Sequence, residues 1–213
     1  MDPMRIAYFV SGNGSTFQYL AERLKRERTD AVSALLLSSN KKALALDRAA
    51  KLGIPAEAVR ERDFATTAEF TDALLAVLHT HKIGFICLAG YMKLVPKEVV
   101  NEYDGRIINV HPALLPAFGG QGMYGRRVHE AVIASQAKVS GATIHLVDCE
   151  YDRGPIVAQQ ALCIRPNDTA ESLETRVHAM EVQLYYNTLL LFIQNRVKIT
   201  DHRATILPPL PND

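Results

Sequence analysis

Apolar runs alternate with more polar, helix-like segments along this chain, from its first residues to about residue 198. Short continuous apolar runs predict buried strands at 5–10, 33–38 and 83–89, from 107, and at 141–147 and 155–164. Between them the pattern predicts helices from about residue 16, at 41–52, 69–81, 96–101 and 127–135, and from about 168. This order favours an α/β fold whose central sheet is mostly parallel and carries helices on both faces. The later strands leave room for antiparallel partners.

The last long helix has the clearest boundary signals. Asp168 and Glu171 have the spacing of a capping box, which predicts the helix start. Apolar residues then recur at spacings of four, three and four, which predicts a stripe facing the core: Leu173, Val177, Met180 and Leu184. After Lys198 the chain is rich in proline. We therefore expect one domain over residues 1–213, in which residues 199–213 form a loosely packed tail.

The stretch Ile107–Pro116, which reads IINVHPALLP, places two polar residues at the end of a predicted strand. Asn109 and His111 lie two apart, so their side chains project to the same side. Pro112 cannot donate to a sheet ladder and favours extended backbone at His111, so the strand should end there. Ligands of open α/β sheets bind at strand ends. The structural alternative is a proline turn in which Asn109 is a cap and His111 is a satisfied polar group.

A glycine-rich loop, Gly12, Asn13, Gly14, Ser15 and Thr16, separates the first predicted strand from the first helix. Glycines let an anion approach the backbone, and a helix N-terminus offers free N–H groups. A dinucleotide fingerprint would need a third glycine where Phe17 stands and an acidic residue after the second strand, and a Walker lysine is missing too. The loop therefore favours a single small phosphate over NAD. A plain turn with Ser15 or Thr16 as N-cap is the alternative.

An acidic loop lies between the last two predicted strands and contains Asp148, Glu150 and Asp152. A carboxylate beside an imidazole raises the pKa of the imidazole and selects its tautomer. Asp152 would thus suit His111 as a partner, although sequence spacing cannot prove that they touch. Three solvated acids in a turn are the alternative.

Composition narrows the class of protein. The chain is 48% hydrophobic and 22% charged, as is ordinary for a globular protein. A net charge of +1 predicts no nucleic-acid or anionic membrane partner, and the apolar runs are too short to span a bilayer. The three cysteines lack CxxC spacing and indicate reduced, buried thiols rather than disulfides or zinc ligands. We expect a cytoplasmic protein that binds small molecules and no metal.

Four segments, SGNGS, LAGYMKLV, INVHPALLP and GATIHLVDCEYDRGP, together resemble the glycinamide ribonucleotide formyltransferases of purine biosynthesis. The resemblance runs from about Met4 to Lys198. It implies a Rossmann-like fold with a nucleotide-binding half at about 4–105 and a folate-binding, catalytic half at about 106–198. It also implies transfer of a formyl group from the co-substrate 10-formyltetrahydrofolate to glycinamide ribonucleotide, by a monomer or a homodimer.

The resemblance assigns roles to individual residues. The catalytic residues would be Asn109, His111 and Asp152. The nucleotide substrate would be held by the loop residues Gly12, Asn13, Gly14, Ser15 and Thr16 and by Glu181. The folate would meet Met92, Lys93, Leu94, Val95, Asn109, Asp148 and Asp152. Asn109 and a protonated His111 would stabilise the oxyanion, and Asp152 would keep His111 charged and help to move a proton.

One segment departs from the family pattern, and other functions remain open. After Phe118 the chain reads GGQGMYGRRVHEAV, which is unusually rich in glycine, and this loop is expected to close over the site. The main alternative is a formyltetrahydrofolate deformylase, which uses the same three catalytic residue types but usually carries an extra N-terminal domain. Methionyl-tRNA and sugar formyltransferases carry extra C-terminal domains. A nucleotide-binding regulatory module is the non-enzymatic alternative.

Overall fold

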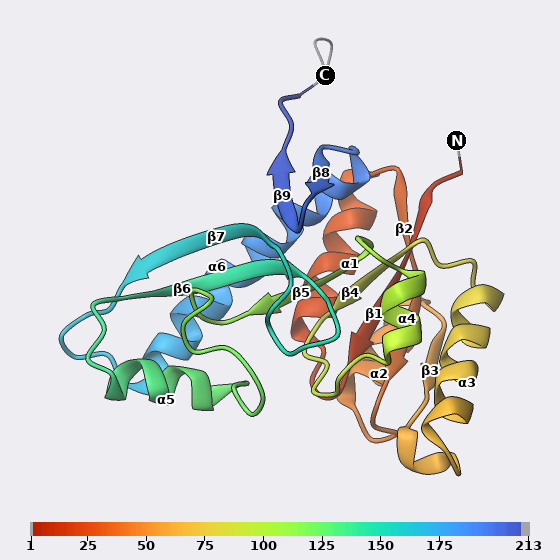
Figure 1. The fold of residues 1–213 in the computed structure, drawn as a ribbon, viewed down its shortest axis with the longest axis horizontal. Coiled ribbons are helices and arrows are strands. Elements are labelled where there is room, and N and C mark those ends of the chain that lie inside the picture. Colours follow the sequence, from red (N-terminus) through yellow and green to blue (C-terminus); the bar gives the residue numbers. More distant parts are fainter. Residues whose placement is uncertain (1, 210–213) are drawn as a thin grey trace. The chain divides into compact units, whose positions relative to one another are not determined.

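The computed structural model describes residues 2–209 and divides into two compact units between Ile108 and Asn109. Its strands form a seven-stranded sheet in the order β3-β2-β1-β4-β5-β6-β7 and a separate two-stranded sheet, β8-β9 (Figure 1). The expected α/β fold with a mostly parallel sheet is confirmed, because β1 pairs in parallel with β2 and β4, and β2 with β3.

The first unit alternates strands with helices. Its elements are β1 (Met4–Val10), α1 (Ser15–Glu27), β2 (Ala31–Ser38), α2 (Leu44–Leu52), β3 (Ala56–Ala58), the 3-10 helix η1 (Glu61–Asp63), α3 (Thr67–Thr80), β4 (Phe85–Leu88) and α4 (Lys97–Glu102). The strand order reverses at β1, since β2 and β3 extend the sheet on one side and β4 on the other. Ligands of open α/β sheets bind outside the carboxyl ends of the strands at such a switch point.

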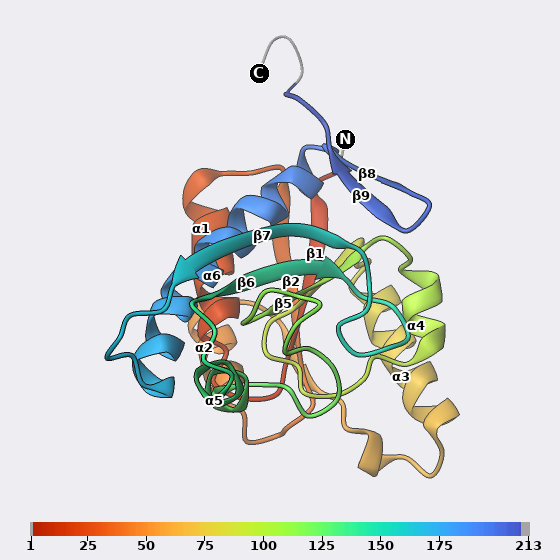
Figure 2. The same cartoon turned by 60° about the vertical axis from the view of Figure 1, so that its left-hand side comes forward.

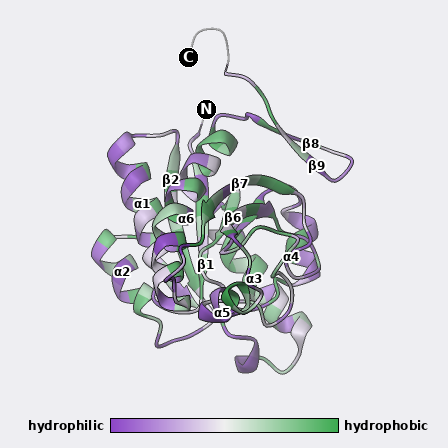
Figure 3. Cartoon of the chain, turned by 90° about the vertical axis from the view of Figure 1, so that its left-hand side faces the viewer, coloured by the Kyte–Doolittle hydropathy of each residue, from purple (hydrophilic) through white to green (hydrophobic). Residues whose placement is uncertain are grey.

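Helix α1 follows from the spacing of its apolar residues. Phe17, Leu20 and Leu24 are buried, as their spacing predicts, together with Thr16 and Ala21. In Figure 3 the hydrophilic colour of α1 contrasts with the hydrophobic colour of β1. The apolar stripe therefore orients this helix, and with it the loop that precedes its first turn.

The starts of two helices differ from prediction because side chains cap or redirect the chain. Helix α2 ends before Gly53 as predicted, but it begins at Leu44 because Asn40 Oδ1 accepts the N–H two residues later at 3.0 Å and holds a turn there. Helix α3 begins earlier than predicted because Thr66 accepts the Glu69 N–H and acts as N-cap.

The second unit begins within β5 (Ile107–His111). It continues with α5 (Arg126–Ala134), β6 (Val139–Leu146), β7 (Ile156–Cys163), α6 (Ala170–Ile193), β8 (Val197–Thr200) and β9 (Arg203–Ile206). Strands β6 and β7 are antiparallel, which is the exception that the sequence left open. The apolar stripe of α6 is confirmed. Its residues Leu173 and Val177 form a core cluster with Val132 and Ala142, and Met180 and Leu184 pack against this cluster.

The capping box of α6 lies one residue later than predicted. Thr169 is the N-cap, and its side chain accepts the Ser172 N–H, while Ser172 Oγ accepts the Thr169 N–H. Asp168 instead accepts a hydrogen bond from Ser172 Oγ at 2.9 Å and pairs with Arg176. The 24-residue α6 is the longest helix within residues 2–209, and neither it nor any other helix there combines the length and apolar character needed to cross a bilayer.

Within the tail expected to be loosely packed, residues 199–206 lie in the β8–β9 hairpin, which the sequence did not predict and whose residues are mostly exposed (Figure 2). Its turn places Asp201 and His202 at φ 48° and 57°. Two left-handed residues suit a tight hairpin turn, but without glycine the sequence carries no strong signal for one. Residues 210–213 lie outside the described part of the chain.

The expectation of buried thiols is wrong for two of the three cysteines. Cys87 is buried, whereas Cys149 and Cys163 are exposed. Cys149 follows β6 in a loop, and Cys163 ends β7, which forms one edge of the sheet. These two thiols are exposed because of where they lie in the fold. Apolar neighbours in the sequence do not reveal that position.

Candidate active site

The stretch IINVHPALLP forms β5 and the short apolar segment 113–115 after Pro112. The strand ends at His111, before Pro112, as predicted. Thr143 on β6 holds this apolar segment in place through two hydrogen bonds. Its Oγ1 donates to the Ala113 carbonyl at 2.7 Å and accepts the Leu115 N–H at 3.0 Å. These buried contacts fix the end of β5, and therefore the direction of the polar side chains that it carries.

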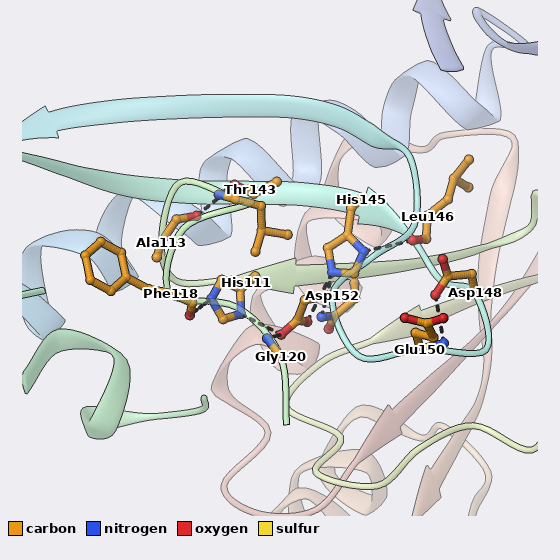
Figure 4. Close-up of polar contacts among 12 residues, drawn as sticks. His111, Ala113, Phe118, Gly120, Thr143, His145, Leu146, Asp148, Glu150 and Asp152 are labelled. Carbon is orange, nitrogen blue, oxygen red and sulfur yellow. Dashed lines mark hydrogen bonds and ion pairs between the residues drawn. The ribbon is translucent and has the colours of Figure 1, made fainter. Parts of the chain in front are cut away.

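His111 and Asp152 meet although they lie far apart in the sequence (Figure 4). His111 Nδ1 is 3.5 Å from Asp152 Oδ2, and the two side chains are 3% and 11% exposed. The Gly120 N–H donates to Asp152 Oδ2 at 2.9 Å, and His111 Nε2–H donates to the Phe118 carbonyl at 2.8 Å. The glycine-rich segment therefore contacts both side chains through its backbone.

Asp152 is not one of three solvated acids, so that alternative is wrong for this residue. Its backbone lies in the left-handed region at φ 57°, an uncommon conformation that marks functional positions when a buried side chain depends on it. Asp148 has a local role, because its Oδ1 accepts the Glu150 N–H at 2.9 Å and shapes the loop. The turn thus delivers one carboxylate to the interior and leaves Glu150 exposed.

Burial and the neighbouring groups shift the pKa values of both His111 and Asp152. Burial lowers the pKa of His111 by more than Asp152 and the Phe118 carbonyl raise it. Burial also acts to raise the pKa of Asp152, but His145, His111 and the Gly120 N–H outweigh it, and this pKa lies below its usual value. Asp152 is therefore ionised at pH 7, and the pKa of His111 lies below its usual value. Burial thus opposes the charge on His111 that Asp152 favours, because a charge is costly where so little solvent reaches.

His145 is a site residue to which sequence reasoning assigned no role. Its Nε2 lies 3.1 Å from Asn109 Nδ2 and 3.5 Å from Asp152 Oδ1, and its Nδ1 donates to the Leu146 carbonyl at 2.8 Å. A second histidine therefore links Asn109 to Asp152, which His111 contacts directly. The available signal was a histidine within a predicted buried strand, which indicates a buried polar group that needs partners.

The glycine-rich loop of the first unit leaves the amino end of α1 open. Gly14 is the N-cap at φ 74°, no side chain caps the helix, and its first turn has no acidic residue. The alternative with Ser15 or Thr16 as N-cap is therefore wrong. Arg48 holds the loop, since its Nε and Nη2 donate to the carbonyl and Oδ1 of Asn13 at 2.8 and 2.7 Å. The N–H groups at the start of a helix, with a guanidinium nearby, suit a small phosphate.

The segment after β4 is tied to this loop at the switch point. The Ser11 N–H donates to the Gly90 carbonyl at 3.0 Å, and Ser11 Oγ accepts the Met92 N–H at 2.8 Å. Met92 and Leu94 are 44% and 43% exposed, and Lys93 is also exposed, whereas Val95 is buried at 2%. Two exposed apolar side chains beside a backbone turn can receive an aromatic ligand, to which Val95 would offer only its backbone.

Glu181 lies on α6 with its side chain 12% exposed and accepts a hydrogen bond from His178 Nδ1 at 2.8 Å. This bond raises the pKa of His178, so that Glu181 is held by a partner that is readily charged. Across residues 2–209, His, Cys, Asp and Glu side chains nowhere gather in a group of three or more that could hold a metal ion.

The chain belongs to the formyl transferase family, whose model it matches over residues 4–189. It is 40% identical over 194 residues to the phosphoribosylglycinamide formyltransferase of Bacillus subtilis, and the match covers 90% of this chain and 97% of that protein. The structure of glycinamide ribonucleotide transformylase 1 from Symbiobacterium toebii matches with a TM-score of 0.90 at 31% identity, over 97% of this chain and 95% of that one. The expected family and fold are thereby confirmed.

A formyltetrahydrofolate deformylase from Pseudomonas syringae shares the fold, with a TM-score of 0.86 over 97% of this chain and 66% of that one. Its sequence is only 21% identical. The likeness to the deformylase therefore extends to the fold alone.

Proposed function

We propose that this protein transfers the formyl group of 10-formyltetrahydrofolate to the amine of glycinamide ribonucleotide in purine biosynthesis. The products are formylglycinamide ribonucleotide and tetrahydrofolate. The observation that carries the proposal is the buried meeting of Asn109, His111 and Asp152 in a chain of the formyl transferase family. Its 40% identity to a phosphoribosylglycinamide formyltransferase selects the acceptor substrate.

The chemistry needs an oxyanion site and a proton acceptor. The amine nitrogen attacks the formyl carbon, a C–N bond forms, and the carbonyl oxygen gains negative charge. The bond from the formyl carbon to the folate nitrogen then breaks, and the proton lost by the amine ends on that nitrogen. Asn109 Nδ2 lies 3.1 Å from His145 Nε2, and an N–H of this amide serves the oxyanion. The Nε2–H of His111 joins it by exchanging the Phe118 carbonyl for the substrate oxygen.

Asp152 suits the proton transfer because it is ionised and shielded from solvent in the resting site. It takes the proton of the attacking amine, directly or through a water molecule, and stabilises the positive charge that His111 gains in the complex. No covalent enzyme intermediate is needed, since the amine attacks the formyl carbon directly.

Binding is divided between the two substrates. The phosphate of glycinamide ribonucleotide binds the open amino end of α1 and its loop, Gly12–Thr16, and Glu181 accepts from its ribose hydroxyls. The folate lies against Met92, Lys93, Leu94 and the backbone of Val95, with Asp148 beside it. We expect the protein to be cytoplasmic and to be a monomer or a homodimer. Sedimentation of the purified protein tests the oligomeric state.

The test is to incubate the protein with 10-formyltetrahydrofolate, with and without glycinamide ribonucleotide, and to follow tetrahydrofolate release. Release only with the nucleotide supports the proposal. Release without it indicates a deformylase, and no release at all indicates a binding module. Asn109→Ala and His111→Ala should each lower kcat by on the order of a hundredfold. Asn187→Ala, at an exposed position of α6, is the control and should leave kcat unchanged.

A further inference from the structure

Three neighbouring parallel strands of the first unit, β2, β1 and β4, end at the same edge of the sheet (Figure 1). Ser11 is the first residue after β1, and Ser39 is the first after β2. Their hydroxyl oxygens lie 2.7 Å apart, and the Ser39 N–H donates to the Val10 carbonyl at 3.0 Å. These contacts hold the segments after β1 and β2 together.

Ser11 also contacts the segment after β4, through both its backbone and its side chain. Its N–H donates to the Gly90 carbonyl at 3.0 Å, and its Oγ accepts the Met92 N–H at 2.8 Å. Gly90 is left-handed at φ 79°, a conformation that glycine adopts without strain and that turns the chain between the two contacts. The position of the Met92 backbone therefore depends on Ser11.

Ser11 directly precedes the glycine-rich loop, Gly12–Thr16. The Gly12 carbonyl accepts the Ala45 N–H at 3.2 Å, so the start of this loop is held on its other side by α2. Ser11 thus joins two segments that the proposed function assigns to different ligands. The loop is assigned to the phosphate of the nucleotide, and residues 92–95 to the folate.

We infer that Ser11 is a positioning residue whose hydroxyl holds the Met92 backbone, so that a phosphate in the loop and a folate against residues 92–95 strengthen each other's binding. A bound phosphate restricts Ser11, and Ser11 in turn restricts Met92. Ordering a segment costs conformational entropy, and a second ligand that meets an already ordered segment loses less of it. The inference rests on the proposed function, because that function assigns the two ligands.

The coupling can be measured in a complex that does not react. Tetrahydrofolate carries no formyl group, so its binding can be titrated with and without glycinamide ribonucleotide. In the wild-type protein the nucleotide should lower the Kd of tetrahydrofolate by about fivefold or more, and tetrahydrofolate should lower the Kd of the nucleotide by the same factor. A wild-type protein in which neither ligand changes the Kd of the other would overturn the inference.

Two substitutions at Ser11 separate its hydroxyl from its backbone. Ser11→Ala keeps the N–H that Gly90 accepts but loses the hydroxyl, so it should bring the ratio of the two Kd values for tetrahydrofolate close to one. The Kd of the nucleotide alone should stay nearly unchanged, because the N–H groups of the loop remain. Ser11→Thr keeps the hydroxyl and should keep most of the coupling. Coupling that survives in Ser11→Ala would contradict the inference.

Ser33→Ala is the matched control. It also removes a serine hydroxyl from this sheet, where Ser33 Oγ lies 2.9 Å from the Tyr8 hydroxyl, but it does so near the start of β2. It should leave the coupling at the wild-type value. Equal loss of coupling in Ser33→Ala and Ser11→Ala would indicate a general loss of stability and would overturn the specific role of Ser11.

Hydrogen exchange of the Met92 amide follows the same contact without any catalysis. In the full-length wild-type protein, inorganic phosphate or glycinamide ribonucleotide should slow this exchange, because each orders the loop next to Ser11. Exchange that neither ligand slows would overturn the inference even if the Ser11 variants failed to fold. If the wild-type protein showed no nucleotide-dependent transfer, the proposed function would fail, and the effect of inorganic phosphate would still decide whether Ser11 links the loop to Met92.

Discussion

Asp152→Asn removes a buried negative charge while almost preserving the shape of the side chain. Asparagine tolerates the left-handed backbone at this position, where φ is 57°. Its Oδ1 can still accept the Gly120 N–H, which the carboxylate holds at 2.9 Å. The substitution therefore tests the charge and leaves the loop in place.

The size of the effect follows from two distances. The carboxylate lies 3.5 Å from His111 Nδ1 and 3.5 Å from His145 Nε2. A unit positive charge at that distance interacts with it by about 5 kcal/mol at an effective permittivity of about 20. Desolvation of a side chain that is 11% exposed offsets part of this. If about 3 kcal/mol of this interaction remains in the transition state, its loss in Asp152→Asn lowers kcat by roughly two orders of magnitude.

The assay is tetrahydrofolate release at pH 7.5 with both substrates saturating, together with thermal unfolding followed by circular dichroism. Asp201→Asn is a matched control, since Asp201 is exposed in the β8–β9 turn and also left-handed at φ 48°. Both variants should melt close to the wild-type protein. Turnover by a folded Asp152→Asn that lay within a few fold of wild type would refute the role given to this charge.

Three further predictions concern the loops and the pH dependence of stability. Gly119→Ala should lower kcat at least tenfold, because a Cβ there would lie 2.5 Å from Leu115 Cδ2 and 3.2 Å from Asp152 Cβ and would displace both side chains. Gly14→Ala should raise the KM for glycinamide ribonucleotide at least tenfold, because its Cβ would lie 2.5 Å from Ala45 Cβ and φ is 74°. His129→Leu should flatten the loss of stability between pH 7 and 5. Burial lowers the pKa of His129, so unfolding takes up a proton below about pH 6.5, and stability falls as pH drops toward the folded pKa.

Each of the three predictions has its own control and its own opposing result. Gly84→Ala serves both glycine variants, since its Cβ would meet no atom nearer than 3.9 Å, and steady-state kinetics make the comparison. Unchanged kcat in Gly119→Ala, or unchanged KM in Gly14→Ala, would contradict the geometry. For His129, urea unfolding at three pH values is compared with that of His202→Leu in the exposed hairpin turn. Equal slopes in both variants would exclude His129 as the group that titrates.

Local patterns were enough to predict most of the fold. The spacing of Phe17, Leu20 and Leu24 predicted α1 and the direction of its buried face, and Pro112 predicted the end of β5 at His111. These features depend on residues a few positions apart, and short-range sterics and helical periodicity act over the same range. The hairpin after Arg196 escaped prediction because its turn lacks glycine and its strands are mostly exposed.

The sequence by itself determined which residue types are present for the candidate chemistry, including Asn109, His111 and Asp152. Only the tertiary structure decided which of these side chains are in contact and how their pKa values are shifted. Asn109 and His145 are 36 residues apart and meet through the pairing of distant strands, and no local pattern encodes such a contact. The lowered pKa of His111 likewise depends on how completely the folded chain excludes water, because desolvation is a property of the packed interior and not of neighbouring residues in the chain.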